Sequence, residues 1–187
     1  MVTSLTPNLV LVGFMGSGKS TIGRRCAHDL GYGFVDTDSI IEAQERTSVA
    51  EIFAARGESG FRDLETAAVE EAASRDHRVI ATGGGAVLRQ SNREALRRTG
   101  IVIWLRITPE EIVARCGDGR TRPLLARSED RLERVTALLQ EREPAYAAAA
   151  HRQVCSTGLT RREAAQRVLR VYDELKRTWC LPAPSAP

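Results

Sequence analysis

A glycine-rich segment near the beginning of the chain has the residue types and spacing that bind phosphate. Residues 13–20 read Gly-Phe-Met-Gly-Ser-Gly-Lys-Ser, which matches the pattern G-x-x-x-x-G-K-[ST]. Glycines let successive backbone N–H groups point at phosphate oxygens, Lys19 reaches the β- and γ-phosphates, and the Ser20 hydroxyl binds Mg²⁺. A glycine turn without a ligand is the alternative, but Lys19 is one of only two lysines in the chain. The segment therefore predicts a site for a nucleoside triphosphate and a magnesium ion.

Two carboxylates follow the second short apolar run of the sequence. Asp36 and Asp38 come directly after residues 34–35, and open α/β sheets bind their ligands at the carboxyl ends of the strands. One carboxylate can hold a metal-bound water while the other accepts a hydrogen bond from a hydroxyl group of the phosphate acceptor. The alternative is that Asp38, which precedes Ser39, simply caps the next helix.

Three consecutive glycines, Gly83, Gly84 and Gly85, follow the third apolar run and Thr82. Glycine lets the backbone approach a ligand closely, and a place after a strand puts the three residues at the same edge of the sheet as the two carboxylates. A tight connection to the next element is the alternative interpretation of this triplet.

Arginine supplies almost all of the positive charge, and its planar guanidinium suits carboxylates and phosphates. Arg62 opens a helix rich in acidic residues, where a solvated ion pair with a neighbouring carboxylate is the alternative. Residues 116–127 interleave glycine with arginine, including Arg122, which predicts a basic flap over the phosphates rather than a simple surface loop. Arg142 precedes Pro144 at the expected end of a long helix, where a contact with the helix dipole is the alternative.

Short apolar runs alternate with segments of helical spacing, which indicates an α/β fold with a doubly wound parallel sheet. The expected strands are 9–12, 34–35, 79–81, 101–107 and 153–156. The expected helices are 19–30, 39–46, 49–55, 60–75, 92–98, 109–115 and 128–142. A last helix begins at a capping box formed by Thr160 and Glu163 and ends near Leu175.

The bulk composition is typical of one soluble domain. A chain of 187 residues with 42% apolar content can bury one sizeable core, so we expect a single domain over residues 1–180 and a disordered Pro/Ala/Ser-rich tail at 181–187. The net charge of +3, from 27 basic and 24 acidic residues, argues against nucleic-acid binding. The four cysteines have no metal-ligand spacing. Because no apolar run is long enough for a signal sequence or a membrane span, we expect a cytoplasmic protein without membrane contact.

Taken in order, these motifs resemble the shikimate kinase family over residues 9 to about 146. The matching segments are the phosphate-binding loop with Thr21, the Asp36-Thr37-Asp38 triplet, Glu51-Ile52-Phe53 with Gly57-Glu58 and Phe61-Arg62, Gly83-Gly84-Gly85, and Arg122-Pro123-Leu124-Leu125. The resemblance implies a five-stranded parallel sheet flanked by helices, of the P-loop nucleoside-monophosphate-kinase type, with a lid at about 116–127. It also implies a monomeric enzyme that uses ATP and Mg²⁺ to phosphorylate the 3-hydroxyl of shikimate, on the route to chorismate and the aromatic amino acids.

The resemblance also implies roles for individual residues. The family's phosphate cradle corresponds to Gly16, Ser17, Gly18, Lys19, Ser20 and Thr21, with Ser20 as the direct Mg²⁺ ligand and Asp36 as a partner of the metal through water. Its substrate-binding residues correspond to Asp38 for the hydroxyls, Arg62 and Arg142 for the carboxylate, and Gly84, with Gly83 and Gly85 beside it, for a backbone contact. Its lid residue that meets ATP corresponds to Arg122.

One nucleotide contact of the family has no counterpart in this sequence. Many members carry an arginine against the adenine near the fifth strand, where this chain reads Val-Cys-Ser-Thr-Gly-Leu at 154–159. Arg115, just before the expected lid, is a candidate for this stacking position because a guanidinium can lie against an aromatic ring.

The resulting mechanism is in-line transfer of a phosphoryl group. Lys19, Mg²⁺ and Arg122 neutralise charge on the moving group, while Asp38 orients or deprotonates the attacking hydroxyl. Two alternatives stay open at this point. Another small P-loop kinase would act on gluconate or on a nucleotide instead of shikimate. A nucleotide-binding module that has lost catalysis would bind ATP without turnover, although Lys19, Ser20, Asp38 and Arg122 are all present in the chain.

Overall fold

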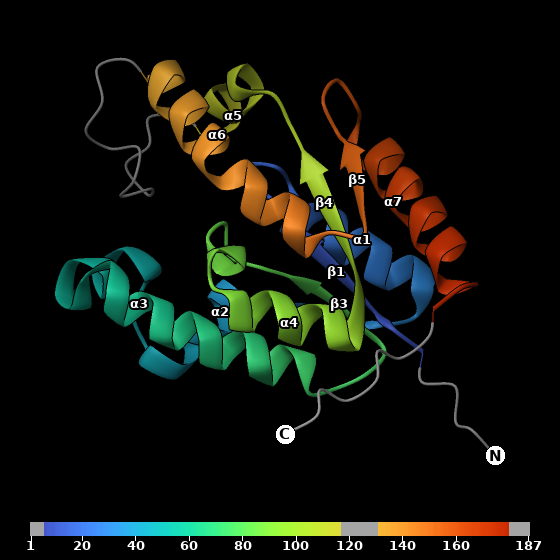
Figure 1. The fold of residues 1–187 in the computed structure, drawn as a ribbon, viewed down its shortest axis with the longest axis horizontal. Helices are drawn as coiled ribbons and strands as arrows, with labels where there is room; N and C mark the ends of the chain where they lie inside the picture. Colours follow the sequence, from blue (N-terminus) through green and yellow to red (C-terminus); the bar gives the residue numbers. More distant parts are fainter. Residues whose placement is uncertain (1–5, 117–130, 180–187) are drawn as a thin grey trace.

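Within residues 6–116 and 131–179, which are the residues that the structure describes, the apolar runs form five parallel strands in one sheet. The structure is a computed structural model, and its strand order is β2-β3-β1-β4-β5 (Figure 1). The strands are β1 (Asn8–Val12), β2 (Gly33–Asp36), β3 (Arg78–Ala81), β4 (Gly100–Arg106) and β5 (Arg152–Cys155). The helices are α1 (Lys19–Leu30), α2 (Thr37–Glu45), α3 (Val49–Ala73), the short 3-10 helix η1 (Ala86–Leu88), α4 (Gln90–Thr99), α5 (Pro109–Cys116), α6 (Arg131–Ala149) and α7 (Arg161–Lys176). The expected parallel sheet flanked by helices is confirmed.

Strand β1 lies in the middle of the sheet and is buried on both faces. Successive side chains of a strand point to opposite faces. Leu9 and Leu11 therefore pack toward α1 and α7, whereas Val10 and Val12 pack toward α3, α4 and α6. Figure 1 shows α1 and α7 on one side of the sheet and the other three helices on the opposite side. Because both faces are covered, the strand is an unbroken apolar run in the sequence.

The helices expected at 49–55 and 60–75 are two parts of one bent element, α3. The bend is at Gly57, whose φ of 67° and ψ of −177° are not helical. Glycine has no Cβ atom and adopts a positive φ at little cost. The break was therefore predicted in the right place, but the two parts are continuous, and the second part carries Arg62.

Helix α6 continues beyond residue 142, where the sequence predicts its end. It runs through Pro144 to Ala149, although a proline in a helix interior lacks an N–H donor and costs about 3 kcal/mol. Tyr146 and Ala149 are fully buried against the sheet, and burying one large side chain contributes a free energy of comparable size. Arg142 consequently lies inside the helix, so the alternative of a helix-end dipole contact is wrong.

Side-chain caps fix the starts of α7 and α2. The capping box of α7 is confirmed, because Thr160 and Glu163 each accept a hydrogen bond from the backbone N–H of the other. Helix α2 begins earlier than expected, and its cap is Asp36, whose Oδ1 accepts from the Asp38 N–H at 3.1 Å. The alternative in which Asp38 caps this helix is therefore wrong.

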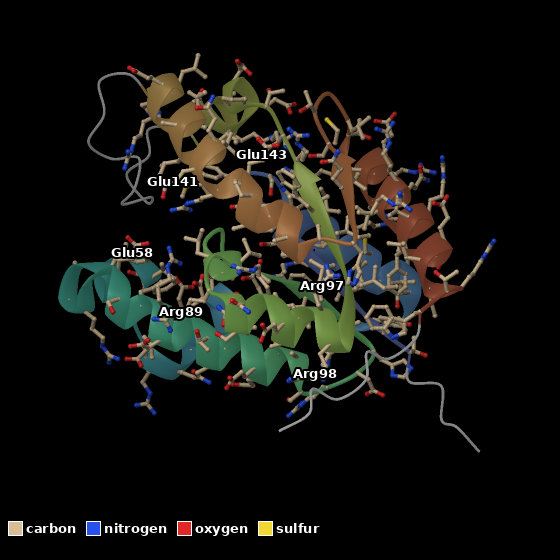
Figure 2. The ribbon with its side chains drawn as sticks, viewed as in Figure 1. Glu58, Arg89, Arg97, Arg98, Glu141 and Glu143 are labelled. Atoms are coloured by element: carbon tan, nitrogen blue, oxygen red, sulfur yellow. The ribbon has the colours of Figure 1, made fainter. Side chains whose placement is uncertain are left out.

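The connection from α6 to β5 is held by a side chain of α4 and by the backbone of β4. Arg97, labelled in Figure 2, donates hydrogen bonds to the carbonyls of Ala149 and Ala150 at 3.0 and 3.3 Å. His151 follows, and its Nδ1 accepts from the Val102 N–H at 2.9 Å. Burial, together with the positive charge of Arg97, lowers the pKa of His151 to about 4. The imidazole is therefore neutral in the folded protein at neutral pH.

The lowered pKa of His151 predicts a pH dependence of stability. An unfolded chain binds this proton near pH 6.5, whereas the folded chain binds it only near pH 4. The contribution of His151 to stability is therefore complete above pH 6.5 and decreases as the pH falls toward 4. Asparagine at this position offers a neutral acceptor that does not titrate. We expect His151→Asn to show a smaller fall in Tm than the parent protein between these pH values, measured by thermal unfolding.

A second histidine provides the matched control for this measurement. The side chain of His28 on α1 is 82% exposed, so His28→Gln controls for the loss of a histidine that is not packed in the core, and its fall in Tm over the same pH values is the reference for His151→Asn. Identical profiles for His151→Asn and the parent protein would contradict the role given to His151.

Candidate active site

The phosphate-binding loop joins the end of β1 to the start of α1 at the carboxyl edge of the sheet. Gly16 and Gly18 have φ values of 79° and 89°, which residues with a Cβ atom rarely adopt. Gly18 is also the N-cap of α1 and gives the helix no side-chain hydrogen bond. The first N–H groups of α1 are therefore free of a side-chain cap at the loop, where they can bind an anion such as phosphate.

Lys19 and Ser20, the first residues of α1, are held in place by hydrogen bonds. The Lys19 ammonium donates to the carbonyls of Gly13 and Phe14 at 2.7 and 2.9 Å, and only 8% of the residue is exposed. The Ser20 hydroxyl donates to Asp36 Oδ2 at 2.6 Å. This second bond connects the phosphate-binding loop to the end of β2.

A pocket of about 600 Å³ lies over the loop, which is the size of a small-molecule site. The sequence-predicted residues that line it are Gly16, Gly18, Lys19, Ser20, Thr21, Asp36, Asp38, Gly84 and Arg115. Ser17 is fully buried within the loop. The lining also includes Ser156, Leu159 and Thr160 from the connection between β5 and α7, where the sequence offered no adenine contact. These residues are candidates for the nucleotide base that sequence reasoning did not assign.

Arg115 lies at the end of α5, beside the phosphate-binding loop. Its guanidinium forms an ion pair with Glu111 at 3.4 Å. The same guanidinium lies close to Gly18, because a Cβ atom added to that glycine would be in van der Waals contact with it. The position is compatible with the predicted contact to the nucleotide. Arg122 and the expected lid, apart from Cys116, lie outside the described residues.

The glycine triplet packs against charged side chains. A Cβ atom on Gly83 would lie 2.6 Å from both Asp38 Oδ1 and Glu65 Oε1. A Cβ atom on Gly85 would overlap the guanidinium of Arg62. A side chain at either position would force these charged groups to shift, so the two glycines let the backbone pass close to them.

Arg62 forms ion pairs with two glutamates of α3. Its guanidinium lies 2.8 Å from Glu58, which is labelled in Figure 2, and 2.7 Å from Glu65. Arg62 and Glu65 are only 8% and 1% exposed, so this ion pair is buried and not solvated as the alternative had it, whereas the Glu58 side chain is 53% exposed. Burial raises the pKa of Glu65, against the opposing charge of Arg62, and the nearby Asp38 carboxylate raises it further. Glu65 Oε1 is buried and has no hydrogen-bond donor among the residues that the structure describes.

Arg142 reaches the same region from α6. It is 4% exposed, and its guanidinium carbon lies 5.7 Å from the centre of the Phe14 ring in the phosphate-binding loop, within the range of a cation–π contact. Its Nε is buried and has no hydrogen-bond acceptor within residues 6–116 and 131–179. Because buried donors in folded proteins are nearly always satisfied, this atom is an expected contact for an anionic ligand.

The fold thus brings together four charged residues from three helices, which we call the charge cluster: Asp38, Arg62, Glu65 and Arg142. Sequence reasoning identified three of them and missed Glu65. The signal was present, because a carboxylate three residues after an arginine lies on the same side of a helix. Phe14 was also missed, since nothing in the sequence places Arg142 beside it.

The donor atoms of Ser20 and Asp36 suit a magnesium ion. Mg²⁺ prefers oxygen ligands and is usually held by one or two protein groups together with phosphate oxygens and water. The Ser20 hydroxyl and the Asp36 carboxylate both line the pocket. In the described part of the chain, no group of three or more His, Cys, Asp or Glu side chains could hold a metal ion. A metal at this site would therefore share its coordination with the phosphates of the nucleotide.

Comparison with known proteins gives one consistent family. A model of the shikimate kinase family matches residues 15–173. The chain is 55% identical over 150 residues to the shikimate kinase of Symbiobacterium thermophilum, a match that covers 80% of this chain and 86% of that protein. It is 46% identical over 169 residues to the shikimate kinase of Caldanaerobacter subterraneus subsp. tengcongensis, covering 90% of this chain and 98% of that protein.

Solved structures agree with the sequence matches. The shikimate kinase from Acinetobacter baumannii in complex with shikimate has a TM-score of 0.87 at 39% identity, over 91% of this chain and 94% of that one. A gluconokinase from Sinorhizobium meliloti has a TM-score of 0.54 at 19% identity, over 94% of this chain and 99% of that one, and this likeness shows the fold alone. From its fold, its phosphate-binding loop and these matches, the chain belongs to the shikimate kinase family.

Proposed function

We propose that this chain transfers the γ-phosphate of ATP to the 3-hydroxyl of shikimate. The observation that carries the proposal is the position of the charge cluster beside the phosphate-binding loop. Within the described residues, the cluster contains a buried donor without an acceptor, Arg142 Nε, and a buried acceptor without a donor, Glu65 Oε1. A ring that carries one carboxylate and several hydroxyl groups can satisfy both atoms. The relatives named shikimate kinase support the same acceptor.

The phosphate-binding loop binds and positions the nucleotide. Negative charge is spread over the phosphoryl oxygens in the transition state, so catalysis depends mainly on positioning and on fixed positive charge. Lys19 and the N-terminal N–H groups of α1 supply such charge at the phosphate-binding loop. Mg²⁺ would be held by Ser20, with Asp36 as a partner through water. It would act as a Lewis acid that stabilises negative charge on the phosphates. Arg122 is the second cation expected from the lid.

The charge cluster binds and orients the acceptor. Arg62 and Arg142 bind its carboxylate, which leaves the hydroxyl groups directed toward Asp38. Asp38 accepts a hydrogen bond from the attacking hydroxyl and is the group to which its proton passes. The hydrogen bond from the Asp38 N–H to Asp36 holds the Asp38 backbone at the sheet edge, from which its carboxylate reaches the pocket.

We also propose that the enzyme acts as a monomer in the cytoplasm, on two small-molecule substrates and without nucleic acid or membrane. Its nearly balanced charge of +3 supports this setting. Of the helices that the structure describes, none combines the length and the apolar character needed to cross a bilayer.

A panel of acceptors tests the reaction. We expect ADP release from Mg·ATP in the presence of shikimate, and background release with gluconate or nucleoside monophosphates, in a coupled assay. Turnover with one of those other acceptors instead would identify a different kinase. Binding of Mg·ATP without turnover of any acceptor would identify a non-catalytic module, and either result would overturn the proposal.

The two lysines of the chain test the role of the loop. Lys19→Ala removes a preorganised cation from the phosphates, and we expect kcat to fall by at least about a hundredfold. Lys176→Ala is the matched control, because this exposed lysine lies at the end of α7. It should keep the kcat of the parent enzyme. A normal kcat for Lys19→Ala would contradict the assigned role.

Two arginines of α6 test the carboxylate contact. Arg142→Ala removes charge-assisted hydrogen bonds to the acceptor, and we expect the KM for shikimate to rise about 10- to 100-fold while the KM for ATP changes little. Arg134, exposed on the same helix, is the control, and Arg134→Ala should leave both constants unchanged. An unchanged shikimate KM in Arg142→Ala would exclude Arg142 from acceptor binding.

A further inference from the structure

Tyr146 is a buried side chain that ends at the glycine triplet. It is 0% exposed, and its hydroxyl donates a hydrogen bond to the Gly84 carbonyl at 2.5 Å. Gly84 lines the pocket over the phosphate-binding loop, whereas Tyr146 approaches it from behind, within the core between α6 and the sheet. The hydroxyl therefore holds a backbone group of the pocket wall and does not itself line the pocket.

The ring of Tyr146 is held in a single orientation by its neighbours. It stacks on Trp104 of β4, with ring centres 5.5 Å apart and an angle of 19° between the planes. Trp104 is 5% exposed, so both rings belong to the packed core. A side chain in such a core has little rotational freedom. The hydroxyl consequently fixes the Gly84 carbonyl at one place.

The same hydroxyl lies beside Arg142, one turn earlier on α6. Residues four apart in a helix are neighbours on its surface. Burial raises the pKa of Tyr146, and the Arg142 guanidinium beside it opposes this rise. The proton of the hydroxyl is therefore retained, and it can be donated to Gly84 while an oxygen lone pair faces the arginine.

Gly84 in turn is packed against the phosphate-binding loop. A Cβ atom on this residue would lie 3.2 Å from the Met15 backbone nitrogen. A shift of the Gly84 carbonyl would therefore move the part of the pocket wall that packs against the phosphate-binding loop. One hydroxyl group contacts the backbone of this wall and lies beside the arginine expected to bind the acceptor carboxylate.

We infer that Tyr146 is a positioning residue for the acceptor, whose hydroxyl sets both the Gly84 carbonyl and the Arg142 guanidinium. The inference rests on the proposed function, because that proposal places the acceptor carboxylate at Arg142. Loss of the hydroxyl leaves a backbone carbonyl without its donor and gives the arginine more freedom. The acceptor is then bound less tightly, while the loop residues that bind the nucleotide keep their contacts.

A purely structural tyrosine elsewhere in the chain provides a matched control. Tyr172 of α7 is also 0% exposed, and its hydroxyl also donates to a backbone carbonyl, that of Pro7, at 2.5 Å. It packs in the core on the opposite face of the sheet, among residues of α1 and α7. Tyr172→Phe therefore removes the same kind of buried hydrogen bond away from the pocket.

The experiment compares Tyr146→Phe with Tyr172→Phe in the full chain. Both variants keep their rings and should lose Tm to a similar extent. We expect Tyr146→Phe alone to raise the KM for shikimate, by about tenfold, with the KM for ATP within about twofold of the parent value. A shikimate KM equal to that of Tyr172→Phe would overturn the inference and leave the proposed function intact. A parent enzyme that does not consume ATP with shikimate would instead refute the proposed function.

A double variant tests whether the effect passes through Arg142. Residues that act together show non-additive effects, whereas independent residues add. In an Arg142→Ala background, Tyr146→Phe should therefore raise the shikimate KM by a smaller factor than it does alone. The same full factor in both backgrounds would overturn the link between the hydroxyl and the arginine.

Discussion

The candidate site is built around one carboxylate, Asp36, which connects the start of α1 at the phosphate-binding loop to the start of α2. Its Oδ2 accepts from the Ser20 hydroxyl and its Oδ1 from the Asp38 N–H. Ser20 belongs to α1, which follows β1 and the phosphate-binding loop, and Asp38 belongs to α2, which follows β2. In the sheet these two strands are separated by β3. Hydrogen bonds to a charged oxygen are shorter and about twice as strong as neutral ones. Asp36 therefore holds Ser20 and Asp38 close to one carboxylate. With the roles proposed for these two residues, the hydrogen bonds would set the spacing between phosphate and acceptor on which in-line transfer depends.

The fold class could be predicted because its signals are local. The glycine-rich loop, the buried apolar runs and the capping box of α7 are each contained in a few adjacent residues. Pro144 shows where such reasoning fails. The local rule ends the helix there, but the packing of Tyr146 on Trp104 of β4 keeps the chain helical. That contact joins residues far apart in sequence, so no pattern around the proline contains it.

The residues of the candidate site could also be predicted only where their signals are local in the sequence. The phosphate-binding loop and the two aspartates could be predicted because they are compact motifs, although their individual roles stay predictions. Glu65 looked like one acidic residue among many in its helix, and only its 1% exposure beside Arg62 distinguishes it. Tyr146 carried no signal in the sequence, because its partner Gly84 lies 62 residues away. Arg122 and the lid stay predictions, since they lie outside the described residues.

The glycine triplet limits the routes by which this enzyme could evolve. At Gly83 and Gly85 any side chain meets a charged group of the cluster, so a mutation there would displace that group before it could offer a new preference. A duplicated gene under selection for a different acceptor would have to vary side chains on α3 and α6, whose tips can be shortened or exchanged without moving the backbone. Under such selection the glycine triplet would stay constant while the helices around it diversify.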